Sequence, residues 1–318
     1  MESSKKELLS SFFKHDKWRL ARCLAPGMGC PSPAIRSHSL QNSQVLDLLA
    51  RDGHVKAIGR RIEEGTMPVF SFDDVGRNRA TTFTGFCSEH DSSIFRPIEF
   101  NTFRPSDSEH LFLVAYRAVV KELHAMMEGA MKIQGTYLKR VDLGFDSGNE
   151  PSPAGLSAIG FMTRAYETHL YKCRFDEMLV TKRFEGVLHD TIKISHEEAA
   201  IAVCSLTSID GLHRNGDWVR VTLNVLPCSG KESIVVFSYL PDDAPLVRSA
   251  LSLILRSEGH YQKYLLSKLI LNNCGNFVVA PAHYDRWSSE KRKAITDYFV
   301  ETLLEGKLEA ENRNLYLF

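Results

Sequence analysis

Four residues in the first hundred have the types and spacing of a metal site. Cys23 and Cys30 flank a loop rich in glycine and proline, and Cys87 and His90 follow a second glycine. Glycines let the backbone turn tightly enough for two thiolates to converge on one ion. Because three thiolates and one imidazole form a common closed shell for zinc, the sequence predicts one structural Zn²⁺ here. In the alternative interpretation, Cys23 and Cys30 are ordinary buried thiols.

His38 is the next candidate for chemistry. It lies eight residues after the second cysteine, between two serines, beyond a short predicted strand that ends near Ile35 and ahead of a predicted helix over 45–50. A histidine in this position can act as a general base, ligate a metal or bond to a hydroxyl group. All three roles remain open from the sequence.

This arrangement resembles the zinc-supported HNH-type endonucleases of the treble-clef kind, in which two zinc knuckles surround a ββα hairpin. In that comparison the two cysteine-bearing pairs are the knuckles and His38 matches the general base. Asp91 matches the residue after the second knuckle, and Glu99 a helix-borne third metal ligand. The sequence departs from the HNH pattern at Ser37, where an acidic residue is usual, and at Asp91, where asparagine is usual.

The resemblance implies a metal-dependent nuclease, with Zn²⁺ holding the fold and Mg²⁺ or Mn²⁺ held among His38, Asp91 and Glu99. His38 would deprotonate a water molecule that attacks a phosphodiester of DNA or RNA. Four arginines are candidates for binding backbone phosphates: Arg36, Arg77, Arg79 and Arg96. A part in bacterial defence follows only by analogy. The departures favour a second hypothesis, a noncatalytic zinc module that binds nucleic acid or a partner protein.

The motifs CxxxxxxC, SHSLQ, GHV, FCSEHD and FRPIE also resemble an uncharacterised bacterial protein family along most of the chain. That likeness supplies no activity.

Composition bounds these hypotheses. The 318 residues are 43% hydrophobic and 25% charged, with a net charge of zero, which is typical of about two globular domains. A neutral chain is unlike proteins that coat nucleic acid nonspecifically. Because no apolar stretch has the length of a membrane span or a signal core, we expect a cytoplasmic protein without a membrane partner. In that reducing compartment four further cysteines are predicted to be packing residues: Cys173, Cys204, Cys228 and Cys274.

The elements that must position these residues follow from hydrophobic periodicity. A short helix is predicted at the N-terminus. A long helix is predicted to begin at a capping box formed by Ser106 and Glu109, to carry an apolar stripe, and to end at Gly135. The stretch 142–155, rich in glycine, serine and proline, is expected to be a connector.

The C-terminal half predicts one helix, then consecutive strands, then helices. Helices are expected over 159–179, 243–257, 259–273 and 288–304, and strands over 188–194, 201–209, 218–226, 233–240 and 276–280. Such an order favours an α+β class with an antiparallel sheet. The predicted organisation is an N-terminal treble-clef or HNH-like zinc module over 1–104, a long helix and connector over 105–155, and a C-terminal α+β domain over 156–318. The oligomeric state is left open.

Several other residues receive structural interpretations. His54 is expected to be a structural residue in a turn, with an accessory site residue as the alternative. Asp73 with Asp74 is expected to be a solvated turn, with ligation of the second ion as the alternative. Phe83 and Phe86 are expected to pack beneath the zinc knuckle, with base stacking as the alternative. An aromatic and polar cluster after Pro281 is interpreted as a surface loop, with a ligand pocket as the alternative: His283, Tyr284, Asp285 and Trp287.

Overall fold

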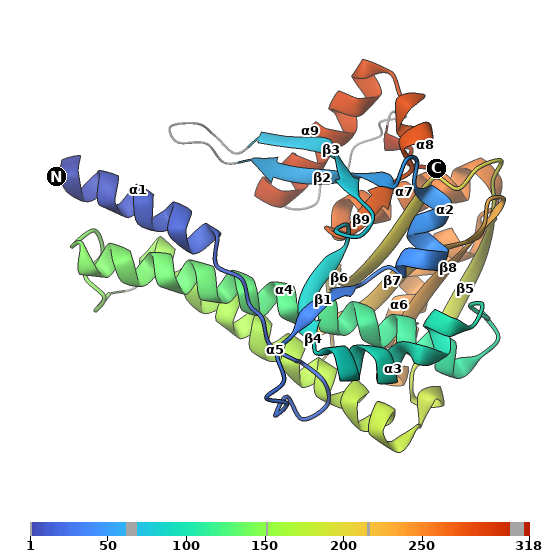
Figure 1. Ribbon diagram of the computed structural model, residues 1–318, viewed down its shortest axis with the longest axis horizontal. Helices are drawn as coiled ribbons and strands as arrows, with labels where there is room; N and C mark the ends of the chain where they lie inside the picture. Colours follow the sequence, from blue (N-terminus) through green and yellow to red (C-terminus); the bar gives the residue numbers. More distant parts are fainter. Residues whose placement is uncertain (1, 62–68, 151, 215–216, 306–314) are drawn as a thin grey trace. The chain divides into compact units, whose positions relative to one another are not determined.

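The computed structural model describes residues 2–61, 69–150, 152–214, 217–305 and 315–318. These residues form helices and antiparallel β-structure, as the order of periodic segments predicted (Figure 1). Their contacts divide the chain into two compact units. The first comprises 1–37, 83–91 and 119–182, and the second comprises 38–82, 92–118 and 183–318.

A seven-stranded sheet is the centre of the second unit, in the order β3-β2-β9-β6-β7-β8-β5. Its strands are β2 (His54–Arg61), β3 (Val69–Gly76), β5 (Leu188–Ser195), β6 (Ile201–Arg214), β7 (Asp217–Ser229), β8 (Glu232–Tyr239) and β9 (Phe277–Val279). The pairings between neighbouring strands are antiparallel. In the short β9, Val279 pairs with Lys56 of β2 and Ile201 of β6, so β9 joins the β2–β3 hairpin to the C-terminal strands.

Helices and strands of this unit share one apolar core. Near-continuous apolar runs in β6, β7 and β8 bury Val203, Leu223 and Phe237 completely. The helices are α6 (Ala244–Arg256), α7 (Gly259–Asn273), α8 (Pro281–Asp285) and α9 (Ser289–Glu305), with a short 3₁₀ turn, η3 (Pro241–Asp243), ahead of α6. In α6 the residues Val247 and Leu251 are one helical turn apart and both enter the core, because that spacing places them on one face.

Two sequence interpretations in this unit are wrong. Asp73 and Asp74 lie in β3 rather than in a turn, and they pair across the hairpin with Arg61 at 2.6 Å and Lys56 at 2.8 Å. The residues from His283 to Trp287 are not a surface loop. They form and follow α8, with Trp287 buried at 5% exposure in the core and the His283 Nε2 donating to the Leu317 carbonyl at 3.0 Å.

Several of the remaining elements are shorter. They are β1 (Ile35–His38), which pairs with β4 (Thr82–Phe86), the helical turns η1 (Asn42–Leu46) and α2 (Asp47–Leu49), the helix α3 (Ser88–Phe100), and η2 (Phe184–Gly186). His54 begins β2 instead of lying in the turn expected for it, and its exposed ring donates from Nδ1 to the Asp52 carbonyl at 2.8 Å.

Long helices build the first unit: α1 (Glu2–Asp16), the part of α4 (Ser108–Asp142) from Val119 onward, and α5 (Pro153–Thr181). Figure 1 shows α4 and α5 side by side as a helical hairpin. Their approach is close at two glycines. A Cβ added at Gly129 would lie 3.3 Å from the Phe161 ring, and one at Gly155 would lie 3.2 Å from the Tyr137 ring.

Both predicted ends of the long helix need correction. The side chain of Asp107 accepts hydrogen bonds from the N–H groups of Glu109 and His110, so Asp107 caps the helix in place of Ser106. The helix also continues past Gly135 to Asp142. Gly135 is a contact point rather than a terminus, because a Cβ there would lie 2.7 Å from the ring of Trp18.

Of the four cysteines predicted to be packing residues, some are buried and one is exposed. Cys204 and Cys274 are buried, as expected, and Cys228 is partly buried. Cys173 is exposed on α5, so its interpretation as a packing residue is wrong. Within the described part of the chain, no helix combines the length and apolar character needed to cross a membrane.

Candidate metal centre

The four residues that the sequence singled out as zinc ligands lie together in the first unit. The ligand atoms of Cys23, Cys30, Cys87 and His90 all lie within 4.8 Å of one another. Among the described residues, this is the one group of three or more His, Cys, Asp or Glu side chains close enough to hold a metal ion. The prediction that two distant loops converge on a single centre is confirmed.

The separations fit a tetrahedral ion. Ligands about 2.3 Å from a tetrahedral centre are about 3.8 Å apart, and shorter metal–nitrogen bonds reduce that spacing slightly. The Cys30 and Cys87 sulfurs are 3.9 Å apart, and the His90 Nδ1 lies 3.5 Å from the Cys23 sulfur and 3.2 Å from the Cys87 sulfur. A disulfide would need about 2.05 Å. The cluster is therefore consistent with zinc and not with a crosslink.

Strand β4 positions one ligand from each half of the site. The N–H groups of Arg22 and Leu24, on either side of Cys23, donate to the carbonyls of Thr84 and Gly85 in β4 at 3.2 and 2.8 Å. Cys87 follows β4 directly, so the two thiols are held at neighbouring points of one backbone ladder. Both side chains are almost completely buried.

The second ligand of each pair comes from a turn. Between Cys23 and Cys30 the backbone takes left-handed angles at Gly27 (φ +79°) and Met28 (φ +50°), and the Met28 N–H closes a turn on the Ala25 carbonyl at 2.9 Å. His90 lies in the first turn of α3. Cys30 and His90 are partly exposed, so a metal ion can enter from their side.

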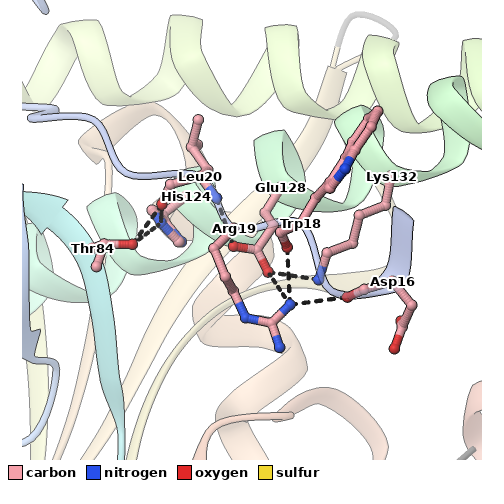
Figure 2. A network of polar contacts seen from close by, with 8 residues as sticks. All are labelled: Asp16, Trp18, Arg19, Leu20, Thr84, His124, Glu128 and Lys132. Carbon is pink, nitrogen blue, oxygen red and sulfur yellow. Dashed lines mark hydrogen bonds and ion pairs between the residues drawn. The ribbon is translucent and has the colours of Figure 1, made fainter. Parts of the chain in front are cut away.

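The segment that leads into Cys23 is fastened to α4. Figure 2 shows His124 and Thr84 both directed at the Leu20 carbonyl, with the His124 Nε2 donating at 2.8 Å. The Leu20 N–H donates to the Glu128 carboxylate at 2.9 Å, and Lys132 pairs with the same carboxylate at 2.8 Å. Both backbone polar groups of Leu20 are thereby satisfied, which fixes the chain three residues before the first ligand.

The charges around the site suit a thiolate cluster. Burial raises the pKa of the Cys23 thiol, whereas the backbone N–H of Ser32 lowers the pKa of the Cys30 thiol. One ion with three thiolates carries a net negative charge, and Cys87 stands at the N-terminus of α3, the positive end of the helix dipole. Burial lowers the pKa of Lys172 on the buried face of α5, and the Asp176 carboxylate and, less strongly, Cys23 oppose that shift.

The residues matched to a nuclease centre do not form a second metal-binding group. His38 ends β1, and its ring Nε2 donates to the Arg77 carbonyl at 3.1 Å. Asp91 is in the first turn of α3, and Glu99 in the last. The Glu99 carboxylate lies 2.6 Å from the guanidinium of Arg117, whose side chain is only 3% exposed. Their catalytic roles stay predictions.

The arginines proposed to bind phosphate have different surroundings. Arg77 pairs with Asp47. Arg36, Arg79 and Arg96 are exposed, and the Arg96 guanidinium lies 6.0 Å from the Phe100 ring centroid. Phe83 and Phe86 are buried with their rings 5.9 Å apart in an edge-to-face arrangement, which confirms the packing role expected of them.

Sequence reasoning missed the residues that support the ligands. His124, Glu128 and Lys132 recur every four residues on α4, a spacing that places polar groups on one helix face. That polar stripe was a signal that a peptide segment lies across the helix.

Comparisons with protein-family models, curated proteins and solved structures gave no match.

Proposed function

We propose that Cys23, Cys30, Cys87 and His90 bind one structural Zn²⁺ ion, and that the module around it binds a partner rather than hydrolysing a substrate. The convergence of the four ligand atoms within 4.8 Å supports the proposal most directly. Four protein ligands complete a tetrahedral shell and leave no position for water or substrate, as in structural zinc sites. The ion would join the segment before β1 to the start of α3.

Two contacts favour binding over catalysis. The His38 Nε2 is engaged with a backbone carbonyl, so on that nitrogen His38 is a donor and not a base. The Glu99 carboxylate is paired with the buried guanidinium of Arg117. If Glu99 turned away to ligate a metal ion, the buried charge of Arg117 would be left uncompensated. A nucleic acid would be held through exposed Arg36, Arg79 and Arg96, whereas a protein partner would not depend on them.

Zinc content and stability test the structural role. Purified protein should contain one Zn²⁺ per chain, and Cys87→Ser should lose the metal and unfold at lower temperature. Cys274→Ser is the matched control, because both cysteines are 2% exposed and only Cys87 belongs to the cluster. Equal zinc content in the two variants would refute the assignment.

A second experiment identifies the partner. If it is a nucleic acid, replacing Arg79 and Arg96 by alanine should weaken nucleic-acid binding and reduce the salt dependence of that binding.

A metal-dependent nuclease is the second candidate function. It is favoured by the pairing of β1, which ends at His38, with β4, and by α3, which follows β4 and has Asp91 in its first turn. These three elements are similar to the two strands and the helix of the HNH enzymes that the sequence resembles, although the β2–β3 hairpin is inserted between β1 and β4. The test is cleavage of plasmid DNA and RNA with Mg²⁺ or Mn²⁺, comparing His38→Ala with His54→Ala as the control. Activity lost only with His38→Ala supports this candidate, and inactive wild-type protein counts against it.

A further inference from the structure

Helix α5 carries an exposed seam along its whole length. Eight positions follow one another in alternating steps of three and four residues, and every one of them is exposed: Leu156, Ile159, Thr163, Tyr166, Leu170, Cys173, Glu177 and Val180. Five of these are large apolar residues with 50–68% of their surface exposed. The opposite face of α5 is buried and includes Ala158, Ala165, Tyr171 and Phe175. The helix is therefore apolar on two sides, of which the fold covers one.

The spacing of the seam identifies the kind of partner. Alternating steps of three and four give a mean period of 3.5 residues, the repeat that keeps a stripe facing a second helix in a left-handed coiled coil. From Leu156 to Val180 the seam extends about 36 Å at ~1.5 Å per residue. A scattered exposed leucine needs no explanation, but a continuous strip of this length marks an interaction surface. The partner surface should itself be a helix with an apolar seam.

We propose that this seam binds the α5 helix of a second copy of the chain, in antiparallel orientation. The charged residues beside the seam favour the antiparallel orientation over the parallel one. Glu167 and Arg174 are seven residues apart, so they lie on the same flank of the seam. In a two-fold antiparallel pair, equal flanks face each other, so Glu167 meets Arg174 of the second copy and the reverse contact forms by symmetry.

A parallel pair of the same helices is less favourable. It would place Glu177 against Glu177 of the second copy within the seam, and like charges brought together in an interface cost binding energy. In the antiparallel register set by the Glu167–Arg174 contacts, Glu177 instead lies opposite the hydroxyl-bearing ring of Tyr166. The same register places Leu170 opposite Cys173. In this register the two seams overlap from Thr163 to Val180, whereas Leu156 and Ile159 extend past the end of the partner's α5.

The association state of the full chain tests the proposal. Sedimentation equilibrium should show a dimer, and Leu170→Glu should raise the dimer dissociation constant at least about tenfold, since it places a charge at the centre of the seam. Leu253→Glu is the matched control, because Leu253 on α6 is 54% exposed and Leu170 is 50% exposed. Circular dichroism and the melting temperature of each variant confirm that the fold is retained. A chain that stays monomeric at high concentration, or a dimer equally stable in both variants, would overturn the proposal.

Charge reversal tests the orientation. Glu167→Arg and Arg174→Glu should each weaken the dimer, because each variant brings like charges together across the two-fold axis. The double variant should restore the affinity, since the opposite charges are re-formed with their positions exchanged. A double variant no tighter than either single variant would refute antiparallel pairing in this register.

Discussion

A buried ion pair on α5 provides a sharp test of how this helix is buried in the first unit. Lys172 is completely buried, and its ammonium lies 2.6 Å from both carboxylate oxygens of Asp176. The pair is four residues apart on the face of α5 that is buried in the first unit. Asp176→Ala removes one partner and leaves a buried ammonium, which is the costly way to break such a pair.

The size of the effect can be bounded. Losing one partner of a buried pair costs roughly 3–5 kcal/mol of unfolding free energy. An upper limit follows from proton release, because Lys172 can become neutral instead of staying charged. From its ordinary pKa of 10.5, deprotonation at pH 7 costs about 4.8 kcal/mol, at about 1.36 kcal/mol per pH unit. We therefore expect Asp176→Ala to cost about 3–5 kcal/mol at pH 7.

The pH dependence has a defined sign. Burial already lowers the pKa of Lys172, and loss of the carboxylate lowers it further. Between that folded-state pKa and 10.5, the unfolded chain binds more protons than the folded chain, so the stability of Asp176→Ala should rise as the pH increases. The deficit relative to wild type should shrink from pH 7 to pH 9.

Urea unfolding followed by circular dichroism at the two pH values measures both quantities. The control is Lys172→Met with Asp176→Leu, which removes both charges and should be roughly neutral in stability. A loss below about 1 kcal/mol for Asp176→Ala, unchanged between pH 7 and pH 9, would show that the Lys172–Asp176 pair is not buried as described.

Three further substitutions test other contacts by urea unfolding. Gly135→Val should cost about 1–3 kcal/mol, because its Cβ would meet the Trp18 ring at 2.7 Å, and unchanged stability would contradict that approach. Glu128→Ala should cost about 1.5–3 kcal/mol by leaving the Leu20 N–H without its carboxylate. Hydrogen bonds from Lys132 and Leu20 lower the pKa of Glu128 although burial opposes them, so this contribution should be present above pH 4.5 and disappear as the pH falls below it. Phe95→Ala should cost about 3–5 kcal/mol, because the fully buried ring supports a guanidinium 3.9 Å from its centroid.

Local signals in the sequence predicted much of the secondary structure. The C-terminal helix expected over 259–273 is α7 (Gly259–Asn273). The strand expected over 188–194 differs from β5 by one residue at one end, and the strand expected over 233–240 differs from β8 by one residue at each end. These segments have strong periodicity and clear boundaries. The metal cluster was also predictable, because ligand-type residues in glycine-rich loops have few other structural uses.

Features set by distant contacts were not predictable. The β2–β3 hairpin joins the main sheet through β9, where one residue pair, Lys56 with Val279, supplies the register. No local pattern specifies a pairing between residues so far apart in sequence. A glycine such as Gly135 is typical of a helix end. Here it lies within a continuous helix, because the ring of Trp18 leaves no room for a Cβ at that position. The apolar stripe of α5 predicted a helix correctly, while its periodicity could not tell that this face is exposed.

The coordination of the bound metal tests the central claim most directly. X-ray absorption spectroscopy at the zinc edge, on the 318-residue chain with its metal content measured, reports the ligand types and their distances. We predict one zinc per chain with three sulfur ligands at about 2.3 Å and one nitrogen ligand at about 2.0–2.1 Å, and no zinc in Cys87→Ser. A protein without zinc, or a zinc shell of oxygen and nitrogen that Cys87→Ser leaves unchanged, would contradict the account.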